Sequence, residues 1–288
     1  MRPVAPGSLS LYNDGMQDKD ALATLAWLVE AGADEATAET PVNRLVGRPA
    51  ASAAVTPMPA TPRPAPAKMA AQGGDPLGDA LAAAAAANSL DELKAAMEAF
   101  EGSALKRGAA NTVFADGTPA GGILFIGEAP GRDEDRIGKP FVGRAGQLLD
   151  KMLASISLDR SRNCYITNVI NWRPPDNRDP SPEEAAICLP FLRRHIELVN
   201  PGLIVLLGAV AARHVMGITE GIMKTRGRWL EYRVGANMVP VMPTLHPAYL
   251  LRQPAHKKLA WRDLQAMAAR MEQLGLGEAR VAGTDVES

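Results

Sequence analysis

Four short apolar runs are spaced along the chain beyond residue 120, and amphipathic patterns lie between them. The runs are Gly122–Ile126, Cys164–Ile170, Leu203–Leu207 and Met238–Met242. Apolar residues recur at helical spacing over Ala145–Ile156, Pro182–Val199, Ala209–Met216 and about Lys257–Leu274. Strands that alternate with helices predict a parallel sheet with helices on both faces. We therefore expect an α/β fold of three layers, α/β/α, with a central four-stranded parallel sheet.

The first 78 residues lack this alternation. Apolar residues lie at helical spacing within 19–32, which predicts a short helix in a segment that spans 1–47. Residues 48–78 are rich in Pro and Ala and have little to bury, so we expect a disordered linker. The globular domain is expected over 79–276, followed by a flexible tail over 277–288.

The composition is typical of a soluble globular protein. The chain has 288 residues, of which 47% are hydrophobic, and two cysteines. No run approaches the roughly 18 apolar residues of a membrane span, and the N-terminus lacks the pattern of a secretory signal. Two cysteines are too few for a disulfide framework, which favours a reducing compartment. We expect a cytoplasmic protein without a membrane partner.

The net charge of −1 hides a local excess of basic residues. Between Lys224 and Arg262 there are eight basic side chains and one acidic side chain, Glu231. The basic residues are Lys224, Arg226, Arg228, Arg233, Arg252, Lys257, Lys258 and Arg262. Such a stretch is either a solvated face or a surface that contacts phosphates.

Three of the predicted strands end in polar segments. The first leads into Gly127-Glu128-Ala129-Pro130-Gly131, the second contains Asn168, and the fourth is followed by Thr244-Leu245-His246-Pro247. Ligands of an open parallel sheet bind beyond the carboxyl ends of its strands, so we expect these groups to converge on one rim. Taken singly, each has an ordinary structural explanation: a strand-to-helix turn, an amide bonded to nearby backbone, and a structural histidine.

The fingerprints of several other chemistries are absent from the sequence. It has neither of the glycine patterns that cradle phosphates, no CxxC or HExxH metal-ligand spacing and no GxSxG elbow. Cys164 opens a predicted strand and Cys188 lies inside a predicted helix, where core packing explains both.

Three segments, in this order, resemble the uracil-DNA glycosylase superfamily, and most closely its family 4 branch. They are GEAPGRDEDRIGKPFVGRAGQLLD (127–150), YITNVINWRPPDNRDPSPEEAAIC (165–188) and TLHPAYLLR (244–252). The resemblance covers roughly residues 89–270. It implies a uracil-DNA glycosylase-like fold and a repair enzyme that flips uracil out of DNA and hydrolyses its N-glycosidic bond. The partners would be uracil-containing DNA and the abasic-site product, in the nucleoid.

The chain departs from family 4 at the cluster ligands. Members of that branch carry four cysteines around an iron–sulfur cluster, and at the corresponding positions this chain has Phe100, Ser103, Trp172 and Cys188. Because thiolates hold such clusters, a single cysteine predicts that none is bound. We expect Phe100 and Trp172 to fill the volume by apolar packing, and we expect no metal and no other cofactor.

The resemblance implies how the base would be recognised. Phe141 would stack on the flipped base, and the Asn168 amide would read the O4 and N3–H edge of uracil. His246 and the backbone N–H near Ala129 would stabilise the uracil anion as it leaves. The methyl group of thymine would be excluded sterically.

The resemblance also implies catalytic and DNA-binding residues. Glu128, or else Glu134, would orient water, and Asn177 would help to position water or phosphate. Leu250 or Leu251 would wedge into the gap left by the flipped base. Contacts to the DNA backbone are expected from Arg178, Arg252, Lys257 and Lys258.

Two other functions are open at this point. One is a uracil-DNA or abasic-DNA binding protein with little or no turnover, because the cluster ligands and Ala129 both depart from known branches. The other is a small nucleotide-binding α/β protein, against which the missing phosphate fingerprints argue. Covalent trapping of DNA is not expected, because residues 173–182 contain no His. We expect a monomer, and the sequence identifies no protein partner for the N-terminal helix.

Overall fold

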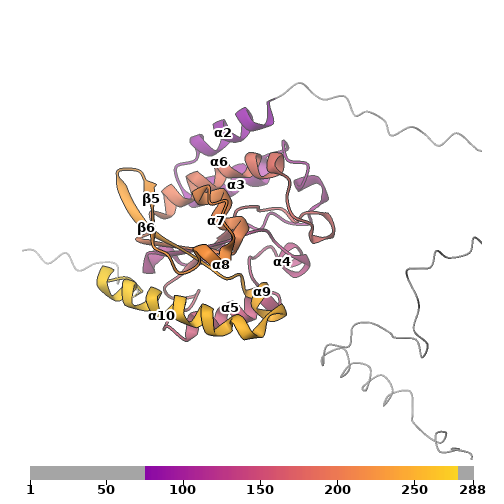
Figure 1. The fold of residues 1–288 in the computed structure, drawn as a ribbon. Helices are drawn as coiled ribbons and strands as arrows, with labels where there is room; N and C mark the ends of the chain where they lie inside the picture. The colour runs from indigo at the N-terminus through magenta and orange to yellow at the C-terminus, as the bar shows by residue number, and fades with distance from the viewer. Residues whose placement is uncertain (1–74, 278–288) are drawn as a thin grey trace, which may run out of the picture. The chain divides into compact units, whose positions relative to one another are not determined.

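The computed structural model of the chain describes residues 75–277, in which a sheet lies between two layers of helices (Figure 1). The predicted helix within 19–32, nearly all of the predicted linker, and residues 278–288 of the predicted tail lie outside the described residues. The first described helix begins at Pro76, slightly before the expected start of the domain at residue 79.

The sheet has six strands in the order β1-β3-β2-β4-β6-β5. They are β1 (Asp116–Gly117), β2 (Ile123–Gly127), β3 (Tyr165–Asn168), β4 (Leu203–Leu207), β5 (Leu230–Val234) and β6 (Asn237–Thr244). The central strands β3, β2, β4 and β6 are parallel, which confirms the prediction. The antiparallel edges β1 and β5 are additions that the sequence does not predict, because β1 is very short and β5 is mostly exposed.

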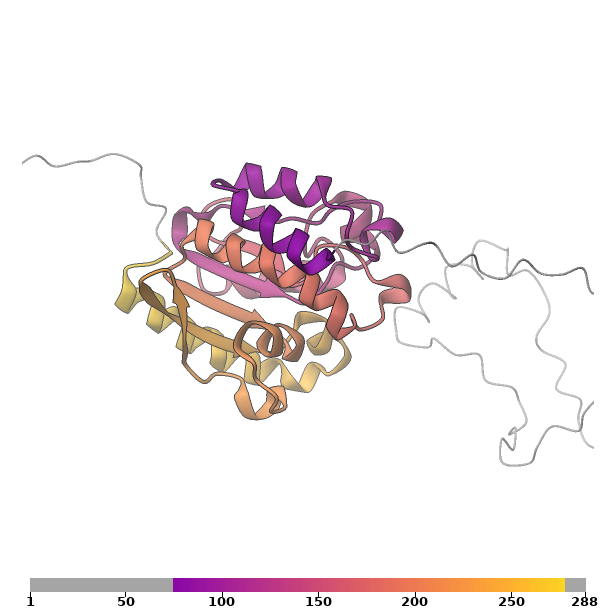
Figure 2. The same ribbon diagram turned by 90° about the horizontal axis from the view of Figure 1, so that it is seen from above.

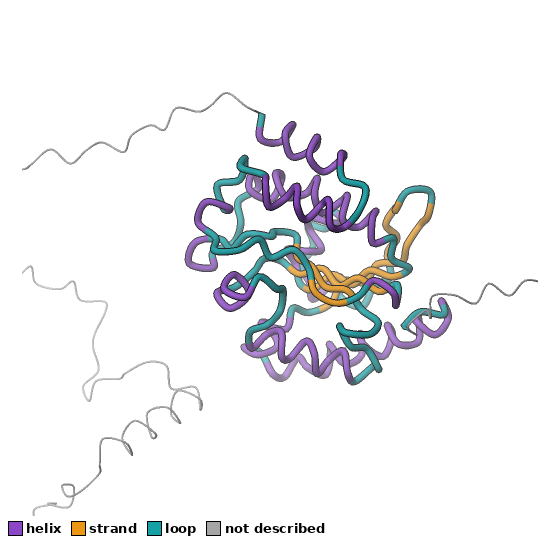
Figure 3. The backbone as a smooth tube through the Cα atoms, turned by 180° about the vertical axis from the view of Figure 1, so that it is seen from behind, coloured by secondary structure: helices purple, strands orange, loops and turns teal. Residues whose placement is uncertain are grey.

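Helices cover both faces of the sheet (Figures 2 and 3). One layer contains α2 (Pro76–Ala86), α3 (Leu90–Ala99), α6 (Pro182–Val199) and α7 (Ala209–Met216). The other contains α5 (Arg144–Ala154), α9 (Pro247–Arg252) and α10 (Lys257–Leu274). Two short helices, α4 (Arg132–Ile137) and α8 (Ile222–Thr225), follow β2 and precede β5. No helix within residues 75–277 is both long enough and apolar enough to cross a membrane.

Side chains of the central strands point alternately to the two faces of the sheet. They are buried on both faces because helices cover each one. In β2, Leu124 and Ile126 pack towards α6, while Ile123 and Phe125 pack towards α5 and α10. A strand buried on both faces is apolar throughout, which is why the continuous runs of the sequence predict these strands.

Capping fixes where α6 begins, and therefore where the loop after β3 ends. The Ser181 hydroxyl accepts a hydrogen bond from the Glu184 N–H at 3.2 Å, and the Glu184 carboxylate accepts from the Ser181 N–H at 2.8 Å. This reciprocal pair satisfies two backbone donors at the start of the helix. Pro182 in the first turn needs no such partner, because it has no N–H.

Candidate active site

The carboxyl ends of β2, β3 and β6 meet at one edge of the sheet, where Figure 1 places α4 and α9. Gly127, the last residue of β2, pairs with Asn168, the last residue of β3. Strand β6 ends at Thr244, and His246 forms the N-cap of α9. Ala129 lies in the turn after β2 and packs partly against the core. Segments far apart in the sequence thus converge on one rim.

The side chains of Asn168 and Phe141 both occupy the space next to Gly127 that a larger residue would fill. A Cβ atom at Gly127 would collide with Asn168 Oδ1 and would lie 2.5 Å from Cζ of Phe141. The ring of Phe141 lies 5.5 Å from the ring of His246, centroid to centroid, with a tilt of 33°. Phe141, Asn168 and His246 therefore form one cluster, the rim group.

The backbone of Phe141 is strained. Its φ is 54°, in the left-handed region that residues with a side chain rarely adopt, and its ring is buried. A Cβ atom at Gly146 would collide with the Phe141 carbonyl, so α5 packs directly against this loop. Such strain persists only where the surrounding structure imposes it, and it is concentrated at ligand sites.

Glu134 imposes part of this constraint. Its Oε1 accepts hydrogen bonds from the N–H groups of Val142 and Gly143, both at 2.9 Å. Its Oε2 accepts from the N–H of Gly131 at 3.1 Å. Both carboxylate oxygens are therefore engaged by the backbone. The expectation that Glu134 orients water does not fit this geometry, and Glu134 instead holds the Phe141 loop in place.

Arg160, which the sequence reasoning missed, holds the other side of the loop. Its guanidinium donates to the carbonyls of Pro140 and Phe141 at 3.1 Å and 3.0 Å. Ion pairs with Asp116 at 3.0 Å and Asp150 at 2.6 Å fix the guanidinium in turn. Burial lowers the pKa of Arg160, but the hydrogen bonds to the two carboxylates outweigh burial and raise it. No sequence pattern links Arg160 to this loop, so only the tertiary contact reveals its role.

The Asn168 side chain is an unsatisfied acceptor. The residue is 1% exposed, and no group within residues 75–277 donates a hydrogen bond to its Oδ1. Buried polar groups are nearly always hydrogen-bonded, because an unpaired one forfeits its hydration. The ordinary structural explanation, an amide bonded to nearby backbone, therefore does not apply to this oxygen. A ligand that donates at this position would satisfy it.

The His246 imidazole has one ring nitrogen that is already engaged by the backbone. Its Nδ1 accepts a hydrogen bond from the N–H of Ala248 at 3.1 Å, which places the ring proton on Nε2. Burial, together with the smaller effect of the positive charge of Arg252, lowers the pKa of His246 to about 4. The imidazole is therefore neutral at neutral pH and acts as a hydrogen-bond donor.

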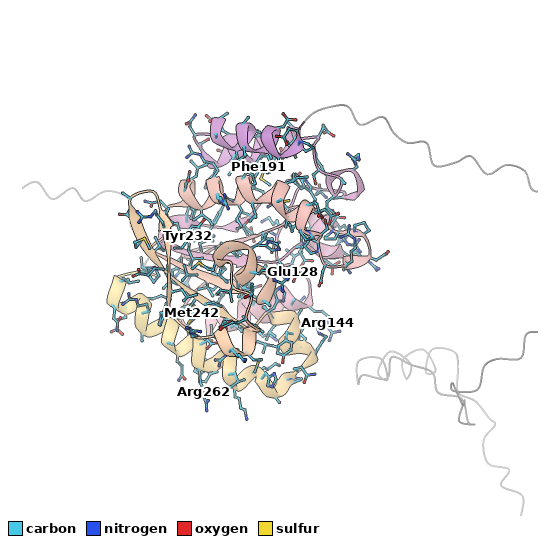
Figure 4. All side chains as sticks on the ribbon, turned by 45° about the horizontal axis from the view of Figure 1, so that its top comes forward. Glu128, Arg144, Phe191, Tyr232, Met242 and Arg262 are labelled. Carbon is cyan, nitrogen blue, oxygen red and sulfur yellow. The ribbon has the colours of Figure 1, made fainter. Side chains whose placement is uncertain are left out.

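Glu128 places a carboxyl group at the same edge, where Figure 4 labels it. Its carbonyl accepts a hydrogen bond from the N–H of Ile170 at 2.9 Å, which ties the turn to the segment after β3. Burial raises the pKa of the Glu128 carboxyl, and Asp179 adds to this, while Arg213 and Arg252 act against it. No short hydrogen bond engages this carboxyl within the described residues.

The two candidates in the loop after β3 form hydrogen bonds with residues close to them in the sequence. Asn177 is exposed, and its Oδ1 accepts a hydrogen bond from Nε of Arg173 at 2.8 Å. Arg178 forms a bidentate ion pair with Glu184, at 2.8 Å and 2.6 Å. Within residues 75–277, no hydrogen bond joins Asn177 or Arg178 to the rim group. The charge of Arg178 is paired with Glu184 at an exposed position, and its predicted phosphate contact stays a prediction.

Helix α9 points one candidate wedge inwards and the other outwards. Leu250 is 1% exposed and packs in the core, so the prediction that it inserts into DNA is wrong. Leu251 is 38% exposed, because adjacent helical residues point about 100° apart. Arg252, Lys257 and Lys258 are exposed and form no ion pair within the described residues, as a phosphate-binding surface requires.

Part of the basic stretch is structural. Arg226 forms an ion pair with the buried Asp263 of α10 and donates to the Leu259 carbonyl at 2.6 Å. Asp263 also accepts a hydrogen bond from the Thr244 hydroxyl at 2.7 Å. These contacts fasten α10 to the end of β6, so Arg226 is unavailable to phosphates.

The positions that correspond to the family 4 cluster ligands form an apolar core in this chain. The rings of Phe100 and Trp172 stack at 6.3 Å, and Phe100 meets the edge of Phe191 at 5.2 Å. Cys188 is buried in the same core, and burial raises the pKa of its thiol to about 12. Ser103 is buried and its hydroxyl has no partner within residues 75–277. One thiol among two rings and a hydroxyl does not fit an iron–sulfur cluster, and the predicted packing of Phe100 with Trp172 is confirmed.

The α/β fold brings an unpaired amide oxygen, an aromatic ring and an imidazole together at the carboxyl edge of its sheet, an arrangement suited to bind a flat, hydrogen-bonding ring. The family model described as "Uracil DNA glycosylase superfamily" matches residues 114–265, which is more than half of the chain. The chain belongs to this superfamily.

Three curated relatives are type-4 uracil-DNA glycosylases. The chain is 42% identical to that of Thermotoga maritima over 158 residues, which cover 54% of this chain and 80% of the relative. It is 46% identical to that of Archaeoglobus fulgidus over 136 residues, 46% of this chain and 68% of the relative. It is 40% identical to that of Sulfurisphaera tokodaii over 160 residues, 54% and 72% of the two chains.

Proposed function

We propose that the chain is a monofunctional uracil-DNA glycosylase, which flips uracil out of DNA and hydrolyses its N-glycosidic bond to leave an abasic site. The activity belongs to the domain of residues 79–276, acting on nucleoid DNA in the cytoplasm. Membership of the superfamily and the relatives named as type-4 uracil-DNA glycosylases support this function.

The observation that carries the proposal is the unpaired Oδ1 of Asn168 beside Phe141. Uracil offers N3–H to this oxygen and O4 to the amide N–H, while its ring stacks on Phe141. Cytosine presents an unprotonated N3 and an amino group at the same two places, so acceptor would face acceptor and donor would face donor. Leaving a buried polar group unpaired costs about 1–3 kcal/mol, which disfavours cytosine.

Cleavage breaks the bond between C1′ and N1, and the electron pair leaves with uracil. The Nε2–H of His246 and the backbone N–H of Ala129 donate hydrogen bonds to the uracil anion as it forms. A neutral imidazole suits this role, because it stabilises the anion without needing to release a proton.

Glu128 orients the water whose oxygen bonds to C1′, and it accepts a proton from that water. A carboxylate whose pKa is raised is a better base for this purpose. Glu134 is not assigned this role, because the backbone engages both of its oxygens. Leu251 fills the gap in the duplex, and Arg252, Lys257 and Lys258 contact phosphates.

A uracil-containing oligonucleotide, incubated with the protein and then with alkali, tests the proposal. Strand cleavage at the uracil is expected for the wild-type chain, with a loss of about 100-fold or more in Asn168→Ala and His246→Ala. Asn237→Ala and His214→Ala, which change the same residue types away from the rim group, should retain wild-type rates. Binding without cleavage would instead establish a DNA-binding protein, and full activity in both rim variants would contradict the assigned site.

A further inference from the structure

An apolar groove of about 260 Å³ lies between α5, α9 and α10, outside the rim group. Its walls include Met152 of α5, Leu250 of α9 and Trp261 of α10. Lys151 and Lys257 stand at its margins. No acidic side chain lines it.

Trp261 is unusually open for an aromatic residue, with 44% of its surface exposed. The other exposed tryptophan of the described residues is Trp229, which the Arg270 guanidinium covers at 5.9 Å from the ring centroid. No cation covers Trp261 in this way within residues 75–277. A large part of the Trp261 surface is therefore open to a ligand.

The surroundings of Trp261 are cationic. Lys151, Lys257, Lys258 and Arg262 are all exposed and form no ion pair within the described residues, and Figure 4 shows Arg262 projecting away from α10. An apolar groove with an aromatic wall and basic side chains around it is an arrangement that binds unpaired nucleobases. Lysine and arginine follow the phosphates while the ring stacks on a base.

The position of the groove relates it to the proposed DNA-binding surface. Leu250 forms part of its wall, and the next residue is the exposed Leu251 assigned as the wedge. The proposed wedge and the groove therefore adjoin each other along α9. We infer that the groove binds an unpaired base next to the flipped uracil, with Trp261 as its stacking surface. This inference rests on the proposed function.

The test measures the affinity of the full chain for a fluorescent, uracil-free oligothymidylate by anisotropy. Stacking is worth about 1–3 kcal/mol per base, so Trp261→Ala should weaken binding about tenfold. Trp261→Phe, which keeps a ring, should recover most of the affinity. Trp229→Ala is the matched control and should bind like the wild type. Thermal melting of each variant verifies that it is folded.

A fully paired duplex of the same length provides the second arm, since its bases are unavailable for stacking. The affinity for the duplex should change less than twofold in Trp261→Ala. Wild-type affinity of Trp261→Ala for the single strand, or an equal loss for both substrates, would overturn the inference. Uracil excision is measured in parallel: its absence in the wild type refutes the proposed function, whereas its presence without a Trp261 effect refutes only the groove.

Discussion

Burial shifts the pKa values of two titratable residues at the edge of the sheet, Glu128 and His246, in directions that suit the proposed reaction. It disfavours the charged form of each, so it raises the pKa of the Glu128 carboxyl and lowers that of His246 to about 4. The charge of Arg252 has a different consequence for each of the two pKa shifts. Its positive charge opposes the shift of Glu128 and reinforces that of His246. One cation thus favours a charged carboxylate and a neutral imidazole, the pair of states that the proposed mechanism needs.

These shifts predict the pH dependence of excision. His246 should contribute no change of the single-turnover rate near pH 6.5, the ordinary pKa of histidine, because it is already neutral there. The rate should fall at lower pH, as Glu128 is protonated at a pKa above its ordinary 4.5. Glu128→Gln should lower the rate about 100-fold and flatten this acid limb.

Single-turnover excision between pH 4 and 8 provides the measurement, with Glu134→Gln as the matched carboxylate variant. Glu134→Gln should keep the acid limb, since Glu134 positions the Phe141 loop and is not the proposed base. A limb centred at pH 6.5 that persists in Glu128→Gln would contradict the neutral state of His246.

At the scale of elements, the loop between α4 and α5 depends on contacts from outside itself. Glu134 of α4 holds its N–H groups, and Arg160, which follows α5, holds its carbonyls. These opposed clamps keep Phe141 in its left-handed conformation. The proposed stacking surface is therefore formed before a base arrives, which would reduce the entropy lost on binding.

Helix α9 provides a comparison between two adjacent leucines. Leu250→Ala should lower the free energy of unfolding by about 2–5 kcal/mol, because it empties a buried site. Leu251→Ala should change stability by less than about 0.5 kcal/mol, as is usual at an exposed site. Leu251→Ala should nevertheless slow uracil excision from duplex DNA about tenfold, since a wedge offsets the cost of unstacking.

Urea unfolding and excision assays on duplex and single-stranded substrates distinguish these effects. The single strand should be spared in Leu251→Ala, because it has no stacked gap to fill. An equal loss on both substrates would show that Leu251 acts in some other way than as a wedge.

For the whole molecule, the stack of Phe100 on Trp172 joins the end of α3 to the loop after β3 and to α6. Apolar packing therefore links these elements at the positions that the resemblance to family 4 relates to cluster ligands. Trp172→Ala should lower the free energy of unfolding by about 3–5 kcal/mol, the cost of a large cavity.

The iron content and chelator sensitivity of the protein test the same idea. Protein purified without oxygen should contain no stoichiometric iron, and chelators should leave its urea midpoint unchanged. Stoichiometric iron, or a midpoint that falls with chelator, would contradict a core held by aromatic packing.

The apolar runs of this chain determine most of its architecture. Strand β4 and the helices α6, α7 and α10 begin and end at the residues that the pattern predicts, because buried strands are continuously apolar and helices repeat every 3.6 residues. The edge strands β1 and β5 are not predicted from the sequence. They are defined by pairing with the neighbouring strands β3 and β6, and not by burial.

The motifs of the sequence also indicate Glu128, Asn168 and His246 as candidate site residues. Polar residues at the ends of apolar strands face the ligand edge of a parallel sheet. Only the tertiary structure decides what each side chain touches. It assigns Glu134 and Arg160 to the Phe141 loop, turns Leu250 into the core, and leaves Oδ1 of Asn168 unpaired. Periodicity along a chain encodes burial, whereas hydrogen bonds between distant segments depend on how the elements pack in space.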